Sequence, residues 1–174
     1  MDEAKYLLDT NVFINAARQY YAFDFAPGFW DALIQHSRRG CIQSIDRVKV
    51  ELERGNDFLS EWVKEQFDKA FRSTDDEDVI SRYGDIMNWV YEQEQYLDAA
   101  KADFANGADG WLLAYALVYD GYIVVTHEVF NSDIKIKVPI PNVCKHFDMH
   151  HIDTYAMLRE LKVKLLCSND QRPI

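Results

Sequence analysis

The sequence has few cysteines and no long apolar run. The three cysteines, Cys41, Cys144 and Cys167, are odd in number and form no CxxC pair, so neither a disulfide framework nor a zinc site is indicated. No stretch approaches the roughly 20 apolar residues that a membrane-spanning helix needs. The first residues lack the basic start and apolar core of a secretory signal peptide. We therefore expect a cytoplasmic protein with reduced thiols and no membrane association.

Positive charge is also scarce. The 19 Lys and Arg residues face 29 Asp and Glu residues, which gives a formal net charge of −10. At long range this charge repels nucleic acids and other polyanions. A nucleic-acid substrate would therefore need local relief, from divalent cations held by clustered carboxylates or from the basic segments 38–39, 47–49 and 135–145. The same segments are equally compatible with ordinary solvated surface.

Apolar residues are plentiful, since 48% of the 174 residues are hydrophobic. That content suits a single packed domain over residues 1–174. Patterning predicts strands at 6–8, 41–45, 122–126 and, as a short final strand, within 147–152. Helices are expected at 11–20, 29–37, from 46 onward, at 111–119 and at 155–164. Because strands alternate with helices, and 122–126 is apolar on both faces, we predict an α/β fold with a parallel sheet.

Two segments do not fit this alternation. Residues 54–105 have helical spacing of apolar positions and predict two or three helices, split by an acidic turn at 73–78. Residues 134–141 alternate Ile with Lys and then reach two prolines, which is typical of an edge segment or a loop.

Four acidic residues lie at the ends of predicted elements. Asp9 follows the first strand, Glu51 is on the helix after the second, Asp109 opens the buried helix, and Glu128 follows the strand at 122–126. Because parallel strands end at one shared edge, we expect these acids to meet. Like charges in contact raise each other's pKa, and a divalent cation relieves that conflict. Oxygen ligands favour Mg²⁺ or Mn²⁺, and a pair of such ions roughly 3.5–4 Å apart promotes phosphodiester cleavage.

Each acid also has a simpler explanation. Asp9 and Asp109 occupy positions where an aspartate often caps a helix. Glu51 is compatible with a solvated helix surface, and Glu53, which points in nearly the opposite direction on a helix, competes with it for the ligand role.

Glu128, Asn11 and Thr126 also have simpler explanations. Glu128 is compatible with a plain loop position, in which case Asp133 is the alternative metal ligand. Asn11 and Thr126 are short polar residues beside strand-end carboxylates, and side chains of this kind can hydrogen-bond a ligand and fix its orientation. A capping or turn role explains either of them equally well.

Taken together, these motifs resemble the PIN-domain ribonucleases. The matching segments are Leu-Asp-Thr-Asn at 8–11, Val-Glu-Leu at 50–52, Ala-Asp-Gly at 108–110 and Val-Thr-His-Glu at 125–128. The segment Lys-Ile-Lys-Val-Pro-Ile-Pro-Asn-Val-Cys at 135–144 looks like that of a poorly characterised branch, and this likeness covers nearly the whole chain.

The resemblance implies a three-layer α/β/α sandwich with a central parallel sheet. The helical stretch 54–105 departs from the family pattern and is expected to be an insertion within the domain, with a substrate clamp, a dimer surface or an antitoxin dock as alternatives. The resemblance further implies Mg²⁺- or Mn²⁺-dependent endonucleolytic cleavage of single-stranded RNA, service as the toxin of a toxin–antitoxin pair with a protein antitoxin, and a possible homodimer. Asp9, Glu51, Asp109 and Glu128 would be the catalytic, metal-binding acids. The commoner family residue at the last position is Asp, so Glu128 is one methylene longer.

Two other classes of protein share some of these sequence features. Aspartyl-phosphate phosphatases also open with an apolar strand and an Asp, but they need a second Asp two residues on, where this chain has Asn11. A non-catalytic binding module, with a degenerate carboxylate cluster and an acidic surface for a basic protein partner, fits the −10 charge and the longer Glu128.

Overall fold

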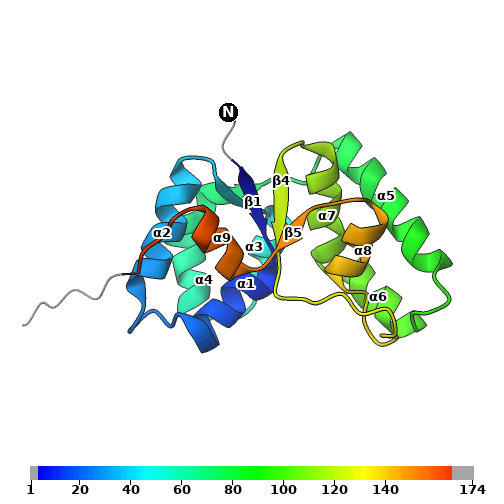
Figure 1. Ribbon diagram of the computed structural model, residues 1–174, viewed down its shortest axis with the longest axis horizontal. Coiled ribbons are helices and arrows are strands. Elements are labelled where there is room, and N and C mark those ends of the chain that lie inside the picture. The colour runs from blue at the N-terminus through cyan, green and yellow to red at the C-terminus, as the bar shows by residue number, and fades with distance from the viewer. Residues whose placement is uncertain (1–3, 166–174) are drawn as a thin grey trace, which may run out of the picture.

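One central sheet of short parallel strands organises the molecule (Figure 1). The computed structural model describes residues 4–165. Within them the strand order is β3 (Phe71–Arg72), β2 (Ile42–Ile45), β1 (Lys5–Leu8), β4 (Tyr122–Val125) and β5 (His151–Ile152), and each neighbouring pair is parallel. The predicted α/β class with a parallel sheet is confirmed.

Strand register brings distant residues to the same edge of the sheet. Leu8 of β1 pairs with Val125 of β4, and Val125 pairs with Ile152 of β5. The first residues beyond β1 and β4 are therefore Asp9 and Thr126, and the Asp9 N–H donates to the Val125 carbonyl at 3.1 Å. The carboxyl edge is thus where the polar residues predicted to be functional gather.

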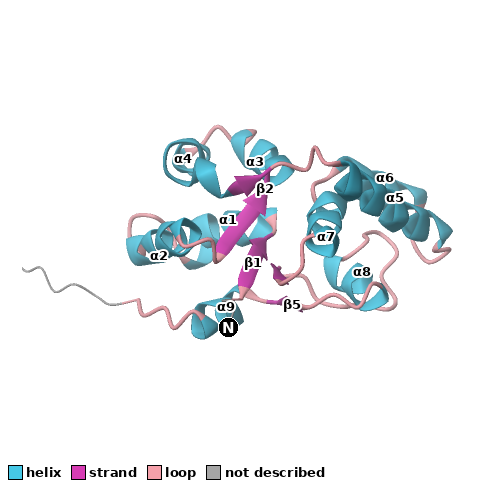
Figure 2. Cartoon of the chain, turned by 90° about the horizontal axis from the view of Figure 1, so that it is seen from above, coloured by secondary structure: helices cyan, strands magenta, loops and turns pink. Residues whose placement is uncertain are grey.

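Helices cover both faces of the sheet, which gives the expected three layers (Figure 2). Figure 2 shows α1 (Thr10–Asn15), α2 (Pro27–Arg38), α4 (Phe58–Trp62) and α9 (Thr154–Glu160) on one side. On the other side lie α5 (Glu77–Glu92), α6 (Asp98–Asn106), α7 (Asp109–Val118) and α8 (Ile140–His146). Helix α3 (Asp46–Glu53) directly follows β2. None of the helices within residues 4–165 is long and apolar enough to cross a bilayer.

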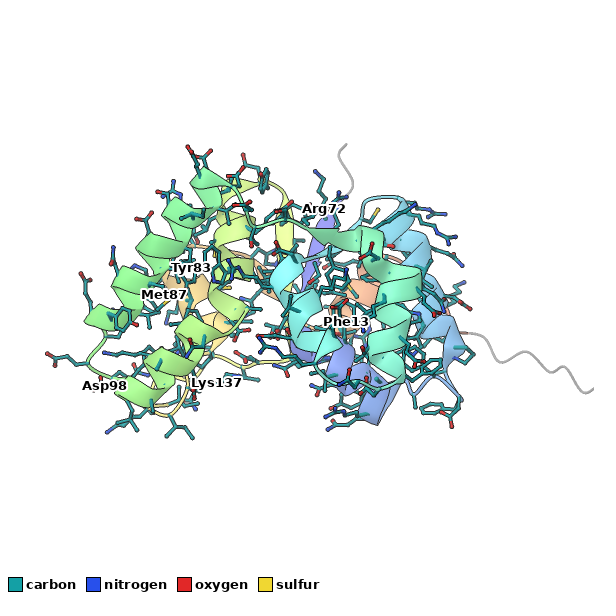
Figure 3. The ribbon with its side chains drawn as sticks, turned by 180° about the vertical axis from the view of Figure 1, so that it is seen from behind. Phe13, Arg72, Tyr83, Met87, Asp98 and Lys137 are labelled. Atoms are coloured by element: carbon teal, nitrogen blue, oxygen red, sulfur yellow. The ribbon has the colours of Figure 1, made fainter. Side chains whose placement is uncertain are left out.

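The two helical layers have different cores. Around Phe13 an aromatic cluster packs on the first face, where Phe13 contacts Phe67 edge-on at 5.6 Å between ring centroids and Trp62 stacks on Phe67. Tyr83 and Met87 of α5 lie on the opposite side of the sheet, as Figure 3 shows. The apolar strand residues Leu7, Leu8, Val124 and Val125 are buried between these layers.

Residues 54–105 contribute to the sheet and are therefore more than the helical insertion expected from the sequence. After α4 come a π-helix (Val63–Phe67), a 3₁₀ turn (Asp68–Ala70) and β3, which pairs with β2 through Ser44–Phe71 and Ile45–Arg72. Helices α5 and α6 follow. A two-residue strand is too short to show an alternating pattern, which explains why the sequence did not indicate it.

Helix α8 is a second difference. The loop or edge segment expected at 134–141 is confirmed for residues 134–139, which form no helix or strand, but an unexpected helix begins at Ile140 with Pro141 in its first turn. Proline is tolerated there because the first helical N–H groups have no partner within the helix. Elsewhere the boundaries shift slightly: the first helix becomes α1 followed by a π-helix at Ala16–Tyr20, and α9 ends at Glu160 instead of near residue 164.

Candidate active site at the carboxyl edge of the sheet

Asp9 lies at the centre of the carboxyl edge and is 1% exposed. Its Oδ2 accepts a hydrogen bond from Thr126 Oγ1 at 3.1 Å, whereas its Oδ1 is buried without a hydrogen-bond partner. Asp9 occupies the N-cap position of α1, yet its side chain makes no capping hydrogen bond. The simple capping explanation therefore does not account for this residue. A buried carboxylate oxygen without a partner is energetically unfavourable unless a cation or a proton compensates it.

The surroundings of Asp9 make its ionised form unfavourable. Burial, and then the charge of Glu128, raise the pKa of Asp9 from 3.8 to about 7. The Thr126 hydroxyl, the backbone N–H of Asn11 and the charge of Lys137 lower the pKa of Asp9, but they do not cancel this increase. A second positive charge at this position would restore the carboxylate.

Glu51 on α3 links three separate segments of the chain. Its Oε2 accepts a hydrogen bond from the Thr10 hydroxyl, and its Oε1 accepts one from the Ala108 N–H at 2.9 Å. Glu53, the competing residue, is paired instead with Lys49 at 3.7 Å. The structure therefore directs Glu51, and not Glu53, toward the starts of α1 and α7.

Asp109 is the first residue of α7, and the capping position belongs to Ala108. Burial raises the pKa of Asp109 well above its usual value, and the charges of Asp9, Glu128 and Glu51 raise it further, against an opposing effect of Lys137. Hydrogen bonds connect this residue to the other acids: Glu51 binds the Ala108 N–H next to Asp109 and the Thr10 hydroxyl next to Asp9, and Thr126 binds Asp9 and the Glu128 N–H.

Glu128 is held by the segment that leads into α8. Its Oε2 accepts a hydrogen bond from the Ile140 N–H at 2.7 Å, and its Oε1 forms an ion pair with Lys137. Burial alone would lower the pKa of Lys137, but Glu128, Asp109 and Asp9 together raise it. Figure 3 shows Lys137 on the loop that leads toward α8. The sequence placed residue 137 within a basic segment and did not connect it to Glu128.

The supporting residues have unequal roles. Thr126 donates to Asp9 and accepts from the Glu128 N–H at 3.1 Å, so it orients both acids. Asn11 is half-buried beside Asp9. Asp133 is exposed and is not among the acids that raise the pKa of Asp9 or Asp109. Thr10, which binds Glu51, was not predicted to be a supporting residue, although it lies between two residues, Asp9 and Asn11, that were singled out.

The donor atoms of the site are of the kind that bind a divalent cation, but the side chains are not positioned to coordinate one together. Carboxylate oxygens suit Mg²⁺ or Mn²⁺, and the unpartnered Asp9 Oδ1 is a free ligand atom. Yet within residues 4–165 no three His, Cys, Asp or Glu side chains are arranged so that they could hold a metal ion. The oxygens of Glu51 and Glu128 are instead used by Thr10, Lys137 and two backbone N–H groups.

Two cavities are each lined by one of the four acids. One of about 310 Å³ is lined by Asp109, Lys137 and Phe104, and the other, of about 140 Å³, is lined by Glu51, Arg47 and further residues of α3, α6 and α7. A larger cavity of about 630 Å³, between residues 37–38 and 64–72, contains none of the four acids.

Comparison with known proteins assigns the chain to a family. No curated protein matches the sequence. Among solved structures, VapBC2 from Rickettsia felis, bound to a DNA fragment from its promoter, is similar with a TM-score of 0.51 at 14% sequence identity. The match covers 85% of this chain and 97% of that one. At this identity the likeness concerns the fold. The profile of a domain of unknown function, DUF4411, matches residues 6–165, so the chain belongs to the DUF4411 family.

Proposed function

We propose that the protein is a Mg²⁺- or Mn²⁺-dependent endoribonuclease that cleaves phosphodiester bonds of single-stranded RNA. The observation that carries this proposal is the buried, unpartnered Oδ1 of Asp9 at the carboxyl edge of a parallel sheet. Glu51 is hydrogen-bonded to residues next to Asp9 and Asp109, and Thr126 links Asp9 to the Glu128 backbone. The sequence motifs that resemble PIN-domain ribonucleases contain the same four acids. The fold likeness to VapBC2 supports the same reading.

Each acid has a proposed role. Asp9, Glu51 and Asp109 would bind the cation, and Glu128 would complete the site or orient water. A bound Mg²⁺ or Mn²⁺ supplies activation of water and stabilisation of the leaving oxygen. The chain's own contribution is orientation: Thr126 fixes Asp9, and Thr10 with the Ala108 N–H fixes Glu51.

We further propose that the protein acts in the cytoplasm as the toxin of a toxin–antitoxin pair, with a protein antitoxin as its partner and a homodimer as a possible assembly. VapBC2 is described as a complex bound to promoter DNA, which supports such a partner here. Expression of the chain alone should then arrest growth, and the arrest should disappear with Asp9→Asn.

The decisive experiment is an RNA cleavage assay with the purified protein. Cleavage of a labelled single-stranded RNA should require Mg²⁺ or Mn²⁺, stop in EDTA and be abolished by Asp9→Asn. Asp85→Asn, which changes an exposed aspartate paired with Arg82, serves as the control and should retain activity. Cleavage that survives chelation or Asp9→Asn would contradict the assignment.

A second candidate is a catalytically degenerate PIN-like module that binds a protein partner. It is favoured by the Lys137–Glu128 ion pair and by the absence, within residues 4–165, of three acids arranged to hold a metal. Calorimetry with Mn²⁺ discriminates the two. Binding that depends on Asp9 and Asp109 favours the nuclease, and no binding favours the module.

A further inference from the structure

Helix α3 presents two arginines on the same face as Glu51. Arg47, Glu51 and Arg54 are spaced by four and then three residues, which aligns them along one side of the helix. Arg47, Glu51 and Arg54 line the cavity of about 140 Å³ together with Gly107, Ala108 and Trp111. Two guanidinium groups therefore lie directly beside one of the proposed metal-binding acids.

Arg47 is held in place by an aromatic ring and a hydroxyl group. Its guanidinium carbon lies 3.7 Å from the centroid of the Trp111 ring, and its Nε donates to Thr74 Oγ1 at 3.1 Å. Thr74 in turn donates to Asp46 Oδ1 at 2.8 Å. A guanidinium has five N–H donors, so this arrangement fixes Arg47 while using one of them.

Arg47 and Arg54 are among the many cations of the protein that form no ion pair. Of the lysines and arginines within residues 4–165, only Arg18, Lys49, Arg82 and Lys137 pair with a carboxylate. Arg47 and Arg54 are also exposed. In a chain with a net charge of −10, two exposed guanidinium groups in one cavity at the edge of an acidic site give that cavity a local attraction for anions.

The same stack of rings determines what kind of anion fits. Tyr83 stacks on Trp111 with 3.8 Å between centroids and 10° between planes. Because Arg47 also lies within 4 Å of the Trp111 centroid, the two neighbours must cover opposite faces of the indole. No face is left for a nucleobase, so recognition here falls to the guanidinium groups. Guanidinium is well matched to phosphate oxygens.

We propose that the cavity of Arg47 and Arg54 binds a backbone phosphate of single-stranded RNA that flanks the bond cleaved at the carboxylate site. The identity of the ligand rests on the proposed ribonuclease function. Contacts to phosphate position a strand without reading its sequence. The cavity therefore determines the position of the RNA strand relative to Glu51 and does not select for a particular base.

The test measures binding without metal, so that it does not depend on cleavage. Fluorescein-labelled ten-nucleotide oligouridine and oligoadenosine RNAs are titrated with protein in EDTA at several NaCl concentrations, with anisotropy as the readout. Arg54→Met should weaken binding of both RNAs about three- to tenfold at low salt. It should also reduce the slope of log K against log [salt] by about 0.7, the value for one phosphate contact on a single strand.

Two further variants sharpen the comparison. Arg159→Met removes the same charge from an exposed position in the last turn of α9 and should leave affinity and slope unchanged. Arg47→Lys keeps the charge but loses the planar fork, and it should weaken binding with little change in slope. In Mn²⁺, Arg54→Met should raise KM for RNA while kcat stays close to that of the wild type.

Several results would overturn the proposal. These are an unchanged salt slope in Arg54→Met, an equal loss of affinity in Arg159→Met, weakening for only one of the two RNAs, or no binding by the wild type in EDTA. The proposed nuclease function can fail separately. If RNA binding depends on Arg54 but the protein does not cleave RNA in Mn²⁺, the phosphate site is supported and the nuclease function is rejected. If cleavage is metal-dependent but the salt slope is unchanged in Arg54→Met, the nuclease function is supported and the phosphate site is rejected.

Discussion

The two flanks of the carboxylate site treat their charges in opposite ways. On the Glu128 flank, formed by Glu128, Lys137 and Ile140, the acid is neutralised by a lysine of the same chain. On the Glu51 flank, formed by Thr10, Arg47, Glu51 and Arg54, neutral donors hold the acid, and the arginines remain without ion pairs within residues 4–165. One flank is therefore charge-balanced internally, whereas the other combines a carboxyl group held only by neutral donors with positive charge that is available for ligands.

The largest expected effect concerns the two glutamates. Glu51→Gln should reduce metal-dependent RNA cleavage by roughly 1,000-fold, equivalent to about 4 kcal/mol of transition-state stabilisation. Glu128→Gln should cost less, because Lys137 already compensates that carboxylate. Single-turnover rates with saturating Mn²⁺ measure both. An equal loss in the two variants would remove the distinction between the flanks.

The next effect concerns stability and pH. The pKa of Asp9 is raised from 3.8 to about 7 in the folded protein, so the folded state prefers the protonated form. The contribution of Asp9 to stability in EDTA should be fully present below about pH 4 and be lost as pH rises toward 7, by on the order of 2–4 kcal/mol. Asp9→Asn removes this charge and should flatten that part of the profile. Urea unfolding between pH 4 and 8 measures it, and equal profiles would contradict the account.

A smaller effect is expected from the packing behind the Glu51 flank. A Cβ at Gly110 would lie 3.0 Å from Tyr83 Cε2 and 3.1 Å from Phe104 Cε1. Gly110→Ala should therefore destabilise the protein by about 1–3 kcal/mol and disturb the stack of Tyr83, Trp111 and Arg47.

Gly84 is the matched control for this substitution. It lies within α5, and a Cβ there would meet nothing within 4 Å. Gly84→Ala should stabilise the helix by about 0.5–1 kcal/mol. Thermal unfolding of both variants checks the pair, and a stabilised Gly110→Ala would show that Tyr83 moves without penalty.

The smallest effect belongs to the Glu128 flank. Lys137→Met releases Glu128 from its ion pair and removes a positive charge near Asp9 and Asp109. Mn²⁺ affinity by calorimetry should rise by about three- to tenfold, a change of roughly 1 kcal/mol. Lys135→Met, on the same exposed segment, should leave affinity unchanged. Weaker Mn²⁺ binding by Lys137→Met would mean that the lysine assists the metal site.

The sequence indicated the parts of the site that depend on local pattern. Asp9 and Glu128 follow strands that are recognisable as apolar runs, and parallel pairing then places their ends at one edge. The side-chain contacts within the site were not accessible in this way. Thr10 and Glu51 lie on two helices that are 41 residues apart in the chain, and Lys137 reaches Glu128 through an irregular loop, so no periodicity encodes either contact.

Two elements were missed for physical reasons of their own. β3 has two residues, so pairing with β2, and not its own propensity, makes it a strand. Helix α8 begins at prolines that usually indicate a loop, and burial of Ile140, Val143 and Cys144 stabilises it. In both cases tertiary packing outweighs local preference.

The position of β1 also has a consequence for biosynthesis. β1 pairs with β2 on one side, but its other neighbour is β4, which the ribosome makes more than 100 residues later. Until then one edge of β1 has no strand partner, and Asp9 lacks the hydroxyl of Thr126. Because N-terminal segments emerge first during synthesis, a nascent chain that stops short of β4 has no assembled acidic site. An enzyme of the proposed activity would therefore be harmless to the RNA around it until β4 and Glu128 have been made.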